Sequence, residues 1–331
     1  MAPTRHDRTA WRPAKVTLCI LTYIPNQIGY YARRLEVFKT SLSSIFANTP
    51  SDQYDILVFD NGSCSEVVDF LRTLRDEGKI DWLMLSTHNV GAGNALVFMF
   101  RAAPGEIVAY SDDDVLFYPG WFEESLKILQ TYPKVGMVSG RPLRGHFGYG
   151  NQYLANYLLQ FPEVSQTCGH FIPDEWEREF ATSINLEVDS FMNHNRQYQD
   201  ILLEYRGVKA YSTATHFQFM ANRNVILEGL QPDWDARLMS GPHIEIDKRI
   251  DSLGYARLST PERYVRHLGN VISPDDHAAI RELGITPFAP PWTPPGRLSQ
   301  EVFRMVNGIK GRLATWAFMV RNLRPWWPSG F

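Results

Sequence analysis

Hydrophobic and polar positions follow two alternating periods along the first 140 residues. Short continuous apolar runs, such as residues 16–21, are typical of strands buried on both faces of a sheet. Between them apolar residues recur at helical spacing, as at Leu35, Phe38 and Leu42. The predicted strands lie at residues 16–21, 55–59, 82–85, 107–110 and 135–138. The predicted helices lie at residues 31–47, 67–75, 93–103 and 120–131.

Strands that alternate with helices of this length predict an α/β fold with a doubly wound, mostly parallel central sheet. In such sheets ligands bind at the carboxyl ends of the strands. The rhythm stops at residues 141–210, which are rich in Gly, His, Tyr, Asn and Gln and predict an irregular insertion over one edge of the sheet. A strand at residues 215–221 and a helix at residues 244–253 follow.

A C-terminal helix is predicted at residues 301–323 from one apolar stripe, behind a proline-dense stretch at residues 287–295. Its polar side is basic and it is followed by Trp326 and Trp327, a pattern that suits a membrane interface. The alternative is a helix that packs on the catalytic domain or on a partner subunit. The pattern leaves both open.

Composition narrows the class of protein. The formal net charge of −3 excludes a general nucleic-acid binder, which normally carries a basic excess. Cys19, Cys64 and Cys168 form no CxxC pair and are expected to be reduced structural thiols. The sequence shows no signal peptide and no run of ~18 apolar residues. We therefore expect a cytoplasmic protein, at most peripheral at the membrane.

Three adjacent carboxylates follow the fourth predicted strand, in the run Ser111-Asp112-Asp113-Asp114. Such a charge cluster is costly unless something compensates it, and Mg²⁺ or Mn²⁺ prefers oxygen ligands. In an extended segment, residues i and i+2 point to the same side, so Asp112 and Asp114 are expected to converge while Asp113 points away. The alternative is a solvated acidic turn before the next helix.

Two loops precede this run at the same predicted edge. In Phe59-Asp60-Asn61-Gly62-Ser63, Asp60 ends a strand and can accept hydrogen bonds from a base or ribose. In the segment from Asn89 to Ala95, Gly91 and Gly93 allow close backbone approach to a ligand ahead of a helix N-terminus that favours anions. Each loop alone fits an ordinary turn.

Together these elements resemble the family 2 glycosyltransferases of the GT-A fold. The resemblance covers about residues 16–270 and is carried by Thr22-Tyr23, the Asp60 and Asn89 loops, and the acidic triplet followed by Pro119-Gly120-Trp121. It is similar to the pattern of bacterial polysaccharide-biosynthesis enzymes, including rhamnosyltransferases. The resemblance implies a GT-A-like fold and an inverting transfer of a sugar from a nucleotide-diphosphate sugar to a hydroxyl acceptor.

The resemblance also implies roles for single residues. The metal, Mn²⁺ or Mg²⁺, would be held by Asp112 and Asp114 against the diphosphate, with His267 as a further ligand. The donor would carry UDP, with GDP and dTDP as alternatives, and the acceptor would be a glycan, a lipid-linked sugar or a small molecule. The nucleotide-sugar-binding residues would be Thr22, Tyr23, Asp60, Asn61, Asn89, Gly91, Asn94 and Asp113.

The later part of the chain departs from the family pattern. Gly254-Tyr255 and Arg249 fit the expected frame, but the frame puts His243 where the catalytic aspartate is expected and Glu245 on the second acid. Histidine has an ordinary pKa near ~6.5 and suits a general base, while glutamate supplies a carboxylate. Both stay open as the catalytic base. The rivals are a sugar nucleotidyltransferase and a catalytically inactive sugar-nucleotide-binding scaffold.

The predicted organisation has five parts. They are a polar tail at residues 1–15, a nucleotide-sugar-binding half at 16–140, an insertion and possible acceptor region at 141–210, a catalytic and acceptor half at 211–286, and a proline-rich linker with the C-terminal amphipathic helix at 287–331.

Overall fold

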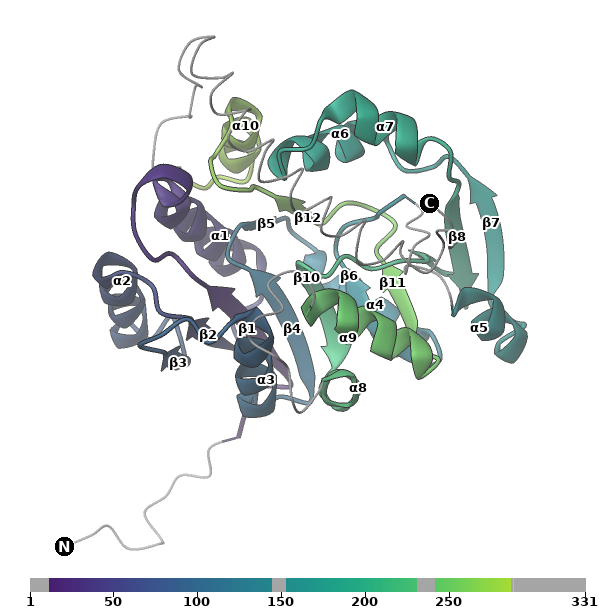
Figure 1. Ribbon diagram of the computed structural model, residues 1–331. Coiled ribbons are helices and arrows are strands. Elements are labelled where there is room, and N and C mark those ends of the chain that lie inside the picture. Colours follow the sequence, from purple (N-terminus) through teal and green to yellow (C-terminus); the bar gives the residue numbers. More distant parts are fainter. Residues whose placement is uncertain (1–11, 145–152, 231–241, 287, 289–331) are drawn as a thin grey trace, which may run out of the picture.

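The computed structural model describes residues 12–144, 153–230, 242–286 and 288 (Figure 1). In its first half, strands alternate with helices as the hydrophobic pattern predicts. The strands are β1 (Val16–Thr22), β2 (Tyr54–Asp60), β3 (Trp82–Leu85), β4 (Ile107–Asp112), β5 (Val115–Phe117) and β6 (Val135–Ser139). The helices are the short 3-10 helix η1 (Gly29–Tyr31), α1 (Arg34–Asn48), α2 (Ser65–Asp76), α3 (Ala92–Ala102) and α4 (Trp121–Thr131).

The second half completes and extends the sheet. Its strands are β7 (Ser165–Gly169), β8 (Asp200–Tyr205), β9 (Val208–Tyr211), β10 (Gln218–Asn222), β11 (Ala256–Ser259) and β12 (Val265–His267). Its helices are α5 (Leu154–Gln160), α6 (Asp174–Ser183), α7 (Val188–Asn195), α8 (Arg223–Gly229), α9 (Pro242–Ser252) and α10 (Pro274–Glu282).

A single ten-stranded sheet forms the centre, in the order β3-β2-β1-β4-β10-β6-β11-β9-β8-β7. β1 pairs in parallel with β2 and β4, whereas β10 runs antiparallel to both of its neighbours. From these pairings and the remaining ones, only β10, β9 and β7 run against the other strands of this sheet. The expected α/β fold with a mostly parallel central sheet is therefore confirmed.

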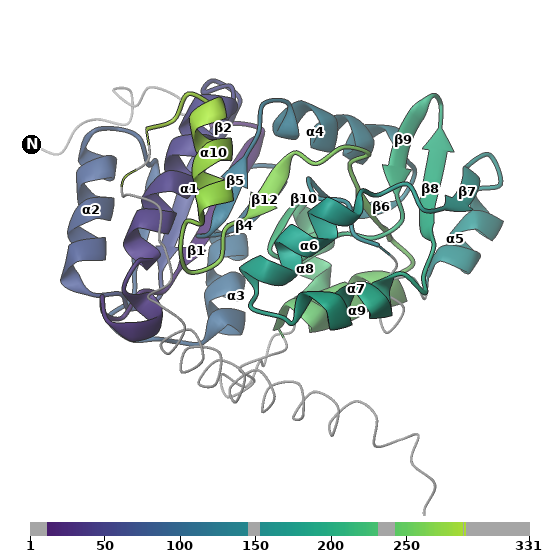
Figure 2. The ribbon, with the colours of Figure 1, turned by 90° about the horizontal axis from the view of Figure 1, so that it is seen from above.

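Apolar side chains of β1 alternate between two cores, which makes the sheet doubly wound. Val16, Leu18 and Ile20 pack with α1, α2 and α4, while Cys19 packs with α3, α8 and α9 on the other face. Figure 2 shows these two helical layers on opposite sides of the strands. Continuous apolar runs predicted this arrangement, because a strand covered on both faces needs no polar side.

A second sheet of two strands, β5 and β12, was not predicted. It is antiparallel, with Val265 opposite Phe117 and His267 opposite Val115. Asp113 and Asp114 form the tight turn that links β4 to β5. The acidic run is therefore held between two strands, and does not lie in a long loop.

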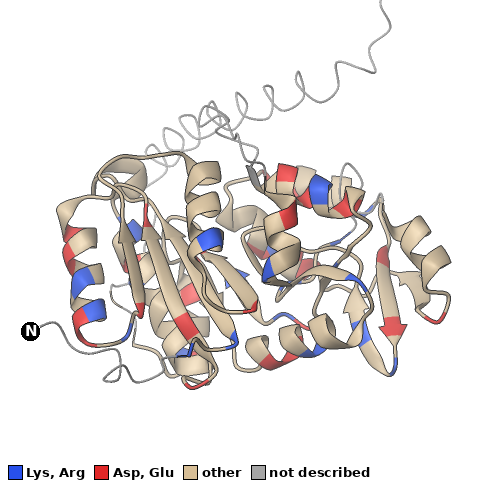
Figure 3. Cartoon of the chain, turned by 90° about the horizontal axis from the view of Figure 1, so that it is seen from below, with Lys and Arg blue, Asp and Glu red and all other residues tan. Residues whose placement is uncertain are grey.

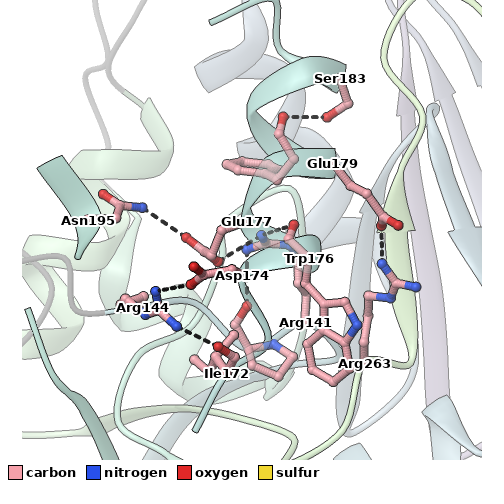
Figure 4. Close-up of polar contacts among 12 residues, drawn as sticks. Arg141, Arg144, Ile172, Asp174, Trp176, Glu177, Glu179, Ser183, Asn195 and Arg263 are labelled. Atoms are coloured by element: carbon pink, nitrogen blue, oxygen red, sulfur yellow. Dashed lines mark hydrogen bonds and ion pairs between the residues drawn. The ribbon is translucent and has the colours of Figure 1, made fainter. Parts of the chain in front are cut away.

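The insertion lies at one edge of the sheet, as expected, but its described residues form mainly regular elements. Strands β9, β8 and β7 continue the central sheet, and α6 and α7 lie beside them (Figures 1 and 2). Two arginines that follow β6 hold α6 in place: Arg141 pairs with Glu177 at 3.0 Å, and Arg144 pairs with Asp174 at 2.7 Å (Figure 4). Glu177 also accepts a hydrogen bond from Asn195 of α7 at 2.8 Å, so the buried polar groups join both helices to the sheet.

Acidic and basic residues intersperse on the helices visible in Figure 3, consistent with the small net charge. Within the described ranges, no helix is both long enough and apolar enough to cross a membrane. The predicted C-terminal helix at residues 301–323, the proline-dense stretch before it and most of the N-terminal tail lie outside the described residues.

Candidate functional site

The carboxyl ends of β1, β2 and β4 lie at one edge of the sheet. Candidate residues predicted from the sequence lie at these strand ends. Thr22 at the end of β1 is the register partner of Asp60 at the end of β2. On the other side of β1, Leu21 is the partner of Asp112. Three predicted site residues from segments far apart in the sequence therefore lie along one edge.

Asp113 and Asp114 share one cation, the guanidinium of Arg34 at the start of α1. Arg34 Nη1 lies 2.6 Å from Asp114 Oδ2, and Arg34 Nη2 forms an ion pair with Asp113. Asp113 also accepts a hydrogen bond of 2.6 Å from the Thr22 hydroxyl. The expectation that Asp113 faces away from Asp114 is wrong, because the two residues form a turn and not a continued strand.

The same guanidinium reaches a late loop of the chain. Arg34 Nη1 donates a hydrogen bond of 3.0 Å to the carbonyl of Gly269. Burial disfavours the charge of Arg34, yet Asp113 and Asp114 together raise its pKa. Arg34 was not a candidate in the sequence, where it lies within a segment that predicts only an amphipathic helix.

The three carboxyl groups differ in how their charge is compensated. Burial raises the pKa of Asp112 to about 7, and the charge of Asp114 adds to the rise. Burial also raises the pKa of Asp113 to about 6 although Arg34 opposes it. For Asp114 the effect of burial is outweighed by His267 and Arg34, which lower its pKa. Asp112 is therefore the acid whose negative charge is least compensated.

Asp112 is the last residue of β4 and is positioned by its own strand and by the strand beside it. Its carboxylate accepts a hydrogen bond of 2.5 Å from the phenol of Tyr110, two residues earlier on the same face. Its backbone N–H donates to the carbonyl of Phe217 at 2.8 Å. The second contact ties the start of β10 to the acidic turn.

His267 reaches the acidic turn from β12. Its Nε2 lies 3.4 Å from Asp114 Oδ2, and its Nδ1 lies 2.9 Å from the hydroxyl of Ser183 on α6. Burial lowers the pKa of His267 despite the charge of Asp114, which favours the neutral ring that a metal requires. The backbone N–H of Leu268 also donates to the carbonyl of Asp114 at 2.8 Å.

The Asp60 and Asn89 loops pack against each other through amide side chains. Asn61 donates to Asn89 at 3.1 Å and accepts from the N–H of Val90 at 2.9 Å, and Asn89 accepts from the N–H of Gly91 at 2.8 Å. Asn94 donates to the carbonyl of Val90 at 2.9 Å. The amides thus satisfy backbone groups of the loops, whether or not they also contact a nucleotide.

Asp60 itself is fully buried and accepts two hydrogen bonds of 3.2 Å from the N–H of Ser63. Burial raises its pKa. Gly62 has a φ of 88°, and a Cβ there would lie 2.9 Å from the backbone carbon of His88, so only glycine fits between the loops. Tyr23 lies next to Tyr31, with ring centroids 6.0 Å apart.

A cavity of about 400 Å³ opens beside Asp112. Three histidines from different elements line it: His216, His243 and His267. Its other walls are mainly apolar and come from the insertion, from the segment before β10 and, at Arg257, from β11. They are Leu143, Phe180, Ile184, Leu186, Phe191, Thr213, Ala214, Thr215, Phe217 and Arg257.

His243 and Glu245, the two residues proposed from the sequence as the catalytic base, have different surroundings in the structure. His243 lines the cavity, and burial followed by the charge of His216 lowers its pKa to about 3. Glu245 pairs with Lys248 at 3.0 Å on the outer part of the same helix and is not among the cavity-lining residues. Their two-residue spacing on a helix explains why only one of them faces the cavity.

His216 and Asp247 were not singled out in the sequence. The His216 ring stacks on His243, with centroids 5.4 Å apart and an interplanar angle of 15°. Its Nδ1 lies 3.6 Å from Oδ2 of Asp247, a carboxylate with 1% of its side chain exposed. The sequence could have indicated Asp247 through its spacing from His243, because residues four apart lie on one face of a helix.

The chain is similar to a protein family, to a curated protein and to several solved structures. The family model described as glycosyl transferase family 2 matches residues 28–211, more than half of the chain. A curated relative, an uncharacterized glycosyltransferase of Nostoc sp., is 31% identical over 108 residues, which is 33% of this chain and 32% of that protein. The chain thus spans about a third of the length of this relative.

Two solved structures are similar at lower identity. The mannosyltransferase PcManGT from Pyrobaculum calidifontis, in complex with GDP-Man and Mn²⁺, is 19% identical, with a TM-score of 0.47 over 82% of this chain and 60% of that one. S. aureus TarS 1-349 in complex with UDP is 13% identical, with a TM-score of 0.43 over 81% of this chain and 64% of that one.

Proposed function

Since the chain belongs to glycosyl transferase family 2, we propose that it is a glycosyltransferase that transfers a sugar from a nucleotide-diphosphate sugar to a hydroxyl acceptor with inversion at the anomeric carbon. The observation that carries this proposal is the meeting of Thr22, Asp60 and Asp112 at one edge of the sheet, beside a cavity with three histidines. The nucleotide would lie over the ends of β1 and β2, and the acceptor would enter the cavity.

On the nucleotide side, Thr22, Tyr23 and Asp60 would line the base and ribose, with Asn61, Asn89, Gly91, Asn94 and Asp113 nearby. The hydrogen bonds among the loop amides support this placement, because they hold the Asp60 and Asn89 loops together. A preorganised loop loses less conformational freedom when the nucleotide binds. UDP is the first candidate for the nucleotide, with GDP and dTDP as alternatives.

The acidic turn has the chemistry to hold Mn²⁺ or Mg²⁺. Oδ1 of Asp114 is buried without a hydrogen-bond partner, and the raised pKa of Asp112 marks a charge that lacks a counterion. Asp112 and Asp114 would hold the metal, and the neutral His267 ring would add a nitrogen ligand. Within the described part of the chain, no group of three or more His, Cys, Asp or Glu side chains is already arranged to hold a metal ion.

A bound divalent cation would neutralise the charge that develops on the leaving diphosphate. Side chains of the protein would supply further positive charge and the catalytic base. Arg34 places a second positive charge at the same turn, within reach of Asp113 and Asp114. On the acceptor side a base must take the hydroxyl proton, and of the two candidates from the sequence the position of His243 in the cavity favours it over Glu245.

A thermal-shift screen tests this proposal. UDP, GDP and dTDP are each added to the full chain with and without Mn²⁺, and we expect one nucleoside diphosphate to raise the melting temperature only when Mn²⁺ is present. Asp114→Ala should abolish that dependence on metal, whereas the exposed Asp76→Ala, on α2, should leave it unchanged. An equal shift in wild type and Asp114→Ala would disprove the metal assignment.

The second step uses the selected nucleotide as its sugar donor. Release of the nucleoside diphosphate from the nucleotide sugar, with water as acceptor, should require the same metal. Binding without any turnover, across UDP-, GDP- and dTDP-sugars, would contradict the proposed reaction.

A further inference from the structure

His216 lines the cavity and is paired with the buried Asp247, and this pair has no part in the function described so far. Asp247 belongs to α9, one helical turn after His243, and its side chain is 1% exposed. His216 precedes β10, and 38% of its side chain is exposed toward the cavity. A buried carboxylate beside one nitrogen of a half-exposed imidazole is the arrangement in which an acid orients a histidine.

The charge of Asp247 is compensated by Arg257, which is itself buried. Arg257 Nη1 lies 3.2 Å from Asp247 Oδ2, and the same guanidinium binds Asp251 through Nε at 2.7 Å and Nη2 at 3.0 Å. Apart from the ion pair with Arg257, neither oxygen of Asp247 has a hydrogen-bond partner among the described residues. An acceptor that is buried and unsatisfied favours the Nδ1–H tautomer of the His216 ring, which points a donor at it.

Contacts other than the one with Asp247 also fix the ring of His216 and its backbone. Its face stacks on His243 at an interplanar angle of 15°. The neighbouring residues hold the backbone, since Thr215 N–H donates to the hydroxyl of Ser139 at 3.1 Å and the carbonyl of Phe217 accepts from Asp112. The second of these bonds fixes the position of His216 relative to the acidic turn.

We propose that His216, oriented by Asp247, is the general base of the transfer, an inference that rests on the proposed function. With Nδ1 directed at Asp247, Nε2 is left to accept the proton of the acceptor hydroxyl. The hydroxyl oxygen forms a bond to the anomeric carbon, the bond from that carbon to the diphosphate oxygen breaks, and its electron pair leaves with the diphosphate. The proton on His216 then passes to solvent.

The alternatives in the same cavity are less suited to this role. Nδ1 of His243 is buried without a partner, and no carboxylate of the described chain forms an ion pair with it. His243 instead provides the surface on which His216 stacks. The distance of 3.6 Å between His216 and Asp247 is longer than a hydrogen bond, and catalytic contacts of this kind commonly tighten when substrate binds.

The kinetic test compares His216→Gln with wild type for hydrolysis of UDP-, GDP- and dTDP-sugars in the presence of Mn²⁺. We expect kcat to fall at least ~100-fold while the affinity for the nucleoside diphosphate stays within about threefold. His194→Gln, an exposed histidine on α7, serves as the matched control and should keep the wild-type rate. A His216→Gln variant whose kcat stays within about threefold of wild type would overturn the assignment.

The role of Asp247 is tested without any substrate, from the ¹⁵N spectrum of the histidine rings. We expect the His216 ring to carry its proton on Nδ1 in wild type and to lose this preference in Asp247→Asn, whose folding is checked by its unfolding curve. A His216 ring protonated on Nε2 in wild type would disprove the pairing. This spectrum does not depend on activity, so it separates a wrong pairing from a failure of the proposed glycosyl transfer.

Discussion

Arg34 Nη1 lies 2.6 Å from Asp114 Oδ2, which makes the start of helix α1 part of the acidic turn between β4 and β5. Arg34 and Asp114 have 12% and 10% of their side chains exposed, so water screens this contact only weakly. The guanidinium of Arg34 therefore balances part of the charge of the acidic triplet, on Asp113 and Asp114. The proposed divalent cation on Asp112 and Asp114 and the guanidinium of Arg34 on Asp113 and Asp114 would therefore share Asp114.

Arg34→Met is expected to destabilise the metal-free protein by about 3–5 kcal/mol, since it leaves Asp113 and Asp114 buried without their cation. Mn²⁺ should recover part of the loss, and the Mn²⁺-induced rise in melting temperature should exceed that of wild type. Urea unfolding with a chelator or with Mn²⁺ measures both effects. The control is Arg33→Met, because Arg33 pairs with Glu36 at the surface and its loss should cost about 0–1 kcal/mol. Equal losses in the two variants would contradict the prediction.

Asp112 predicts a dependence of stability on pH in the absence of metal. Its pKa is raised to about 7 in the folded chain, while an unfolded aspartate titrates near ~3.9, so between these values the folded state binds more protons. The free energy of unfolding should therefore fall by roughly 1–3 kcal/mol as pH rises from ~4 to 7. Asp112→Asn should flatten this slope, and urea unfolding at pH 5 and pH 8 with a chelator checks it. A slope identical to that of wild type would show that Asp112 does not titrate in this window.

Most of the first half of the fold could be predicted from the sequence because each element carries its own hydrophobic period. The strands at residues 16–21, 55–59 and 135–138 lie within β1, β2 and β6, with ends shifted by no more than two residues. The order of strands in a parallel sheet also brought Asp60 and Asp112 to one edge. Local pattern and topology were sufficient at these positions.

The remaining features depend on contacts that no local pattern contains. β5 and β12 are three residues long and exist because each completes the other, so neither has a period to detect. Arg34 is separated from Asp114 by 80 positions, and His216 from Asp247 by 31, so their pairing follows only from the packing of α1 and α9. The regular elements of the insertion were missed for a similar reason, because buried ion pairs such as Arg141 with Glu177 replace much of an apolar stripe.

Glu177→Gln is expected to destabilise the insertion by about 3–5 kcal/mol, because Arg141 would remain buried without its counterion. Arg141 also lies over the ring of Phe180, 4.3 Å from its centroid, and Phe180 lines the cavity. The loss should therefore extend to the cavity wall and raise the KM for the acceptor. Glu175→Gln, at an exposed position of the same helix, should change stability by less than about 0.5 kcal/mol. Unfolding curves and acceptor kinetics of both variants test the two expectations. A similar stability of the two variants would show that the buried pair is not needed for the stability of the fold.

Alanine variants of Gly269 and Gly284 separate two effects. One is the close approach of the loop after β12 to α6, and the other is the strain of a left-handed backbone conformation. Both have a φ of 70°, so an alanine at either should cost about 1–2 kcal/mol for the left-handed conformation. A Cβ at Gly284 would meet nothing within 4 Å, whereas a Cβ at Gly269 would lie 2.3 Å from the backbone oxygen of Ser183. Gly269→Ala must therefore push the loop away from α6.

That displacement should reach the acidic turn, because the carbonyl of Gly269 accepts a hydrogen bond from Arg34 and His267 lies two residues earlier. We expect Gly269→Ala to lose more stability than Gly284→Ala and also to weaken the response of the melting temperature to Mn²⁺ and nucleoside diphosphate, which Gly284→Ala should retain. Thermal unfolding of both variants with and without these ligands measures the difference. If the two variants respond alike, the contact between the loop and Ser183 does not position His267 or Arg34, and the metal end of the site is held by β5 and α1 without help from the late loop.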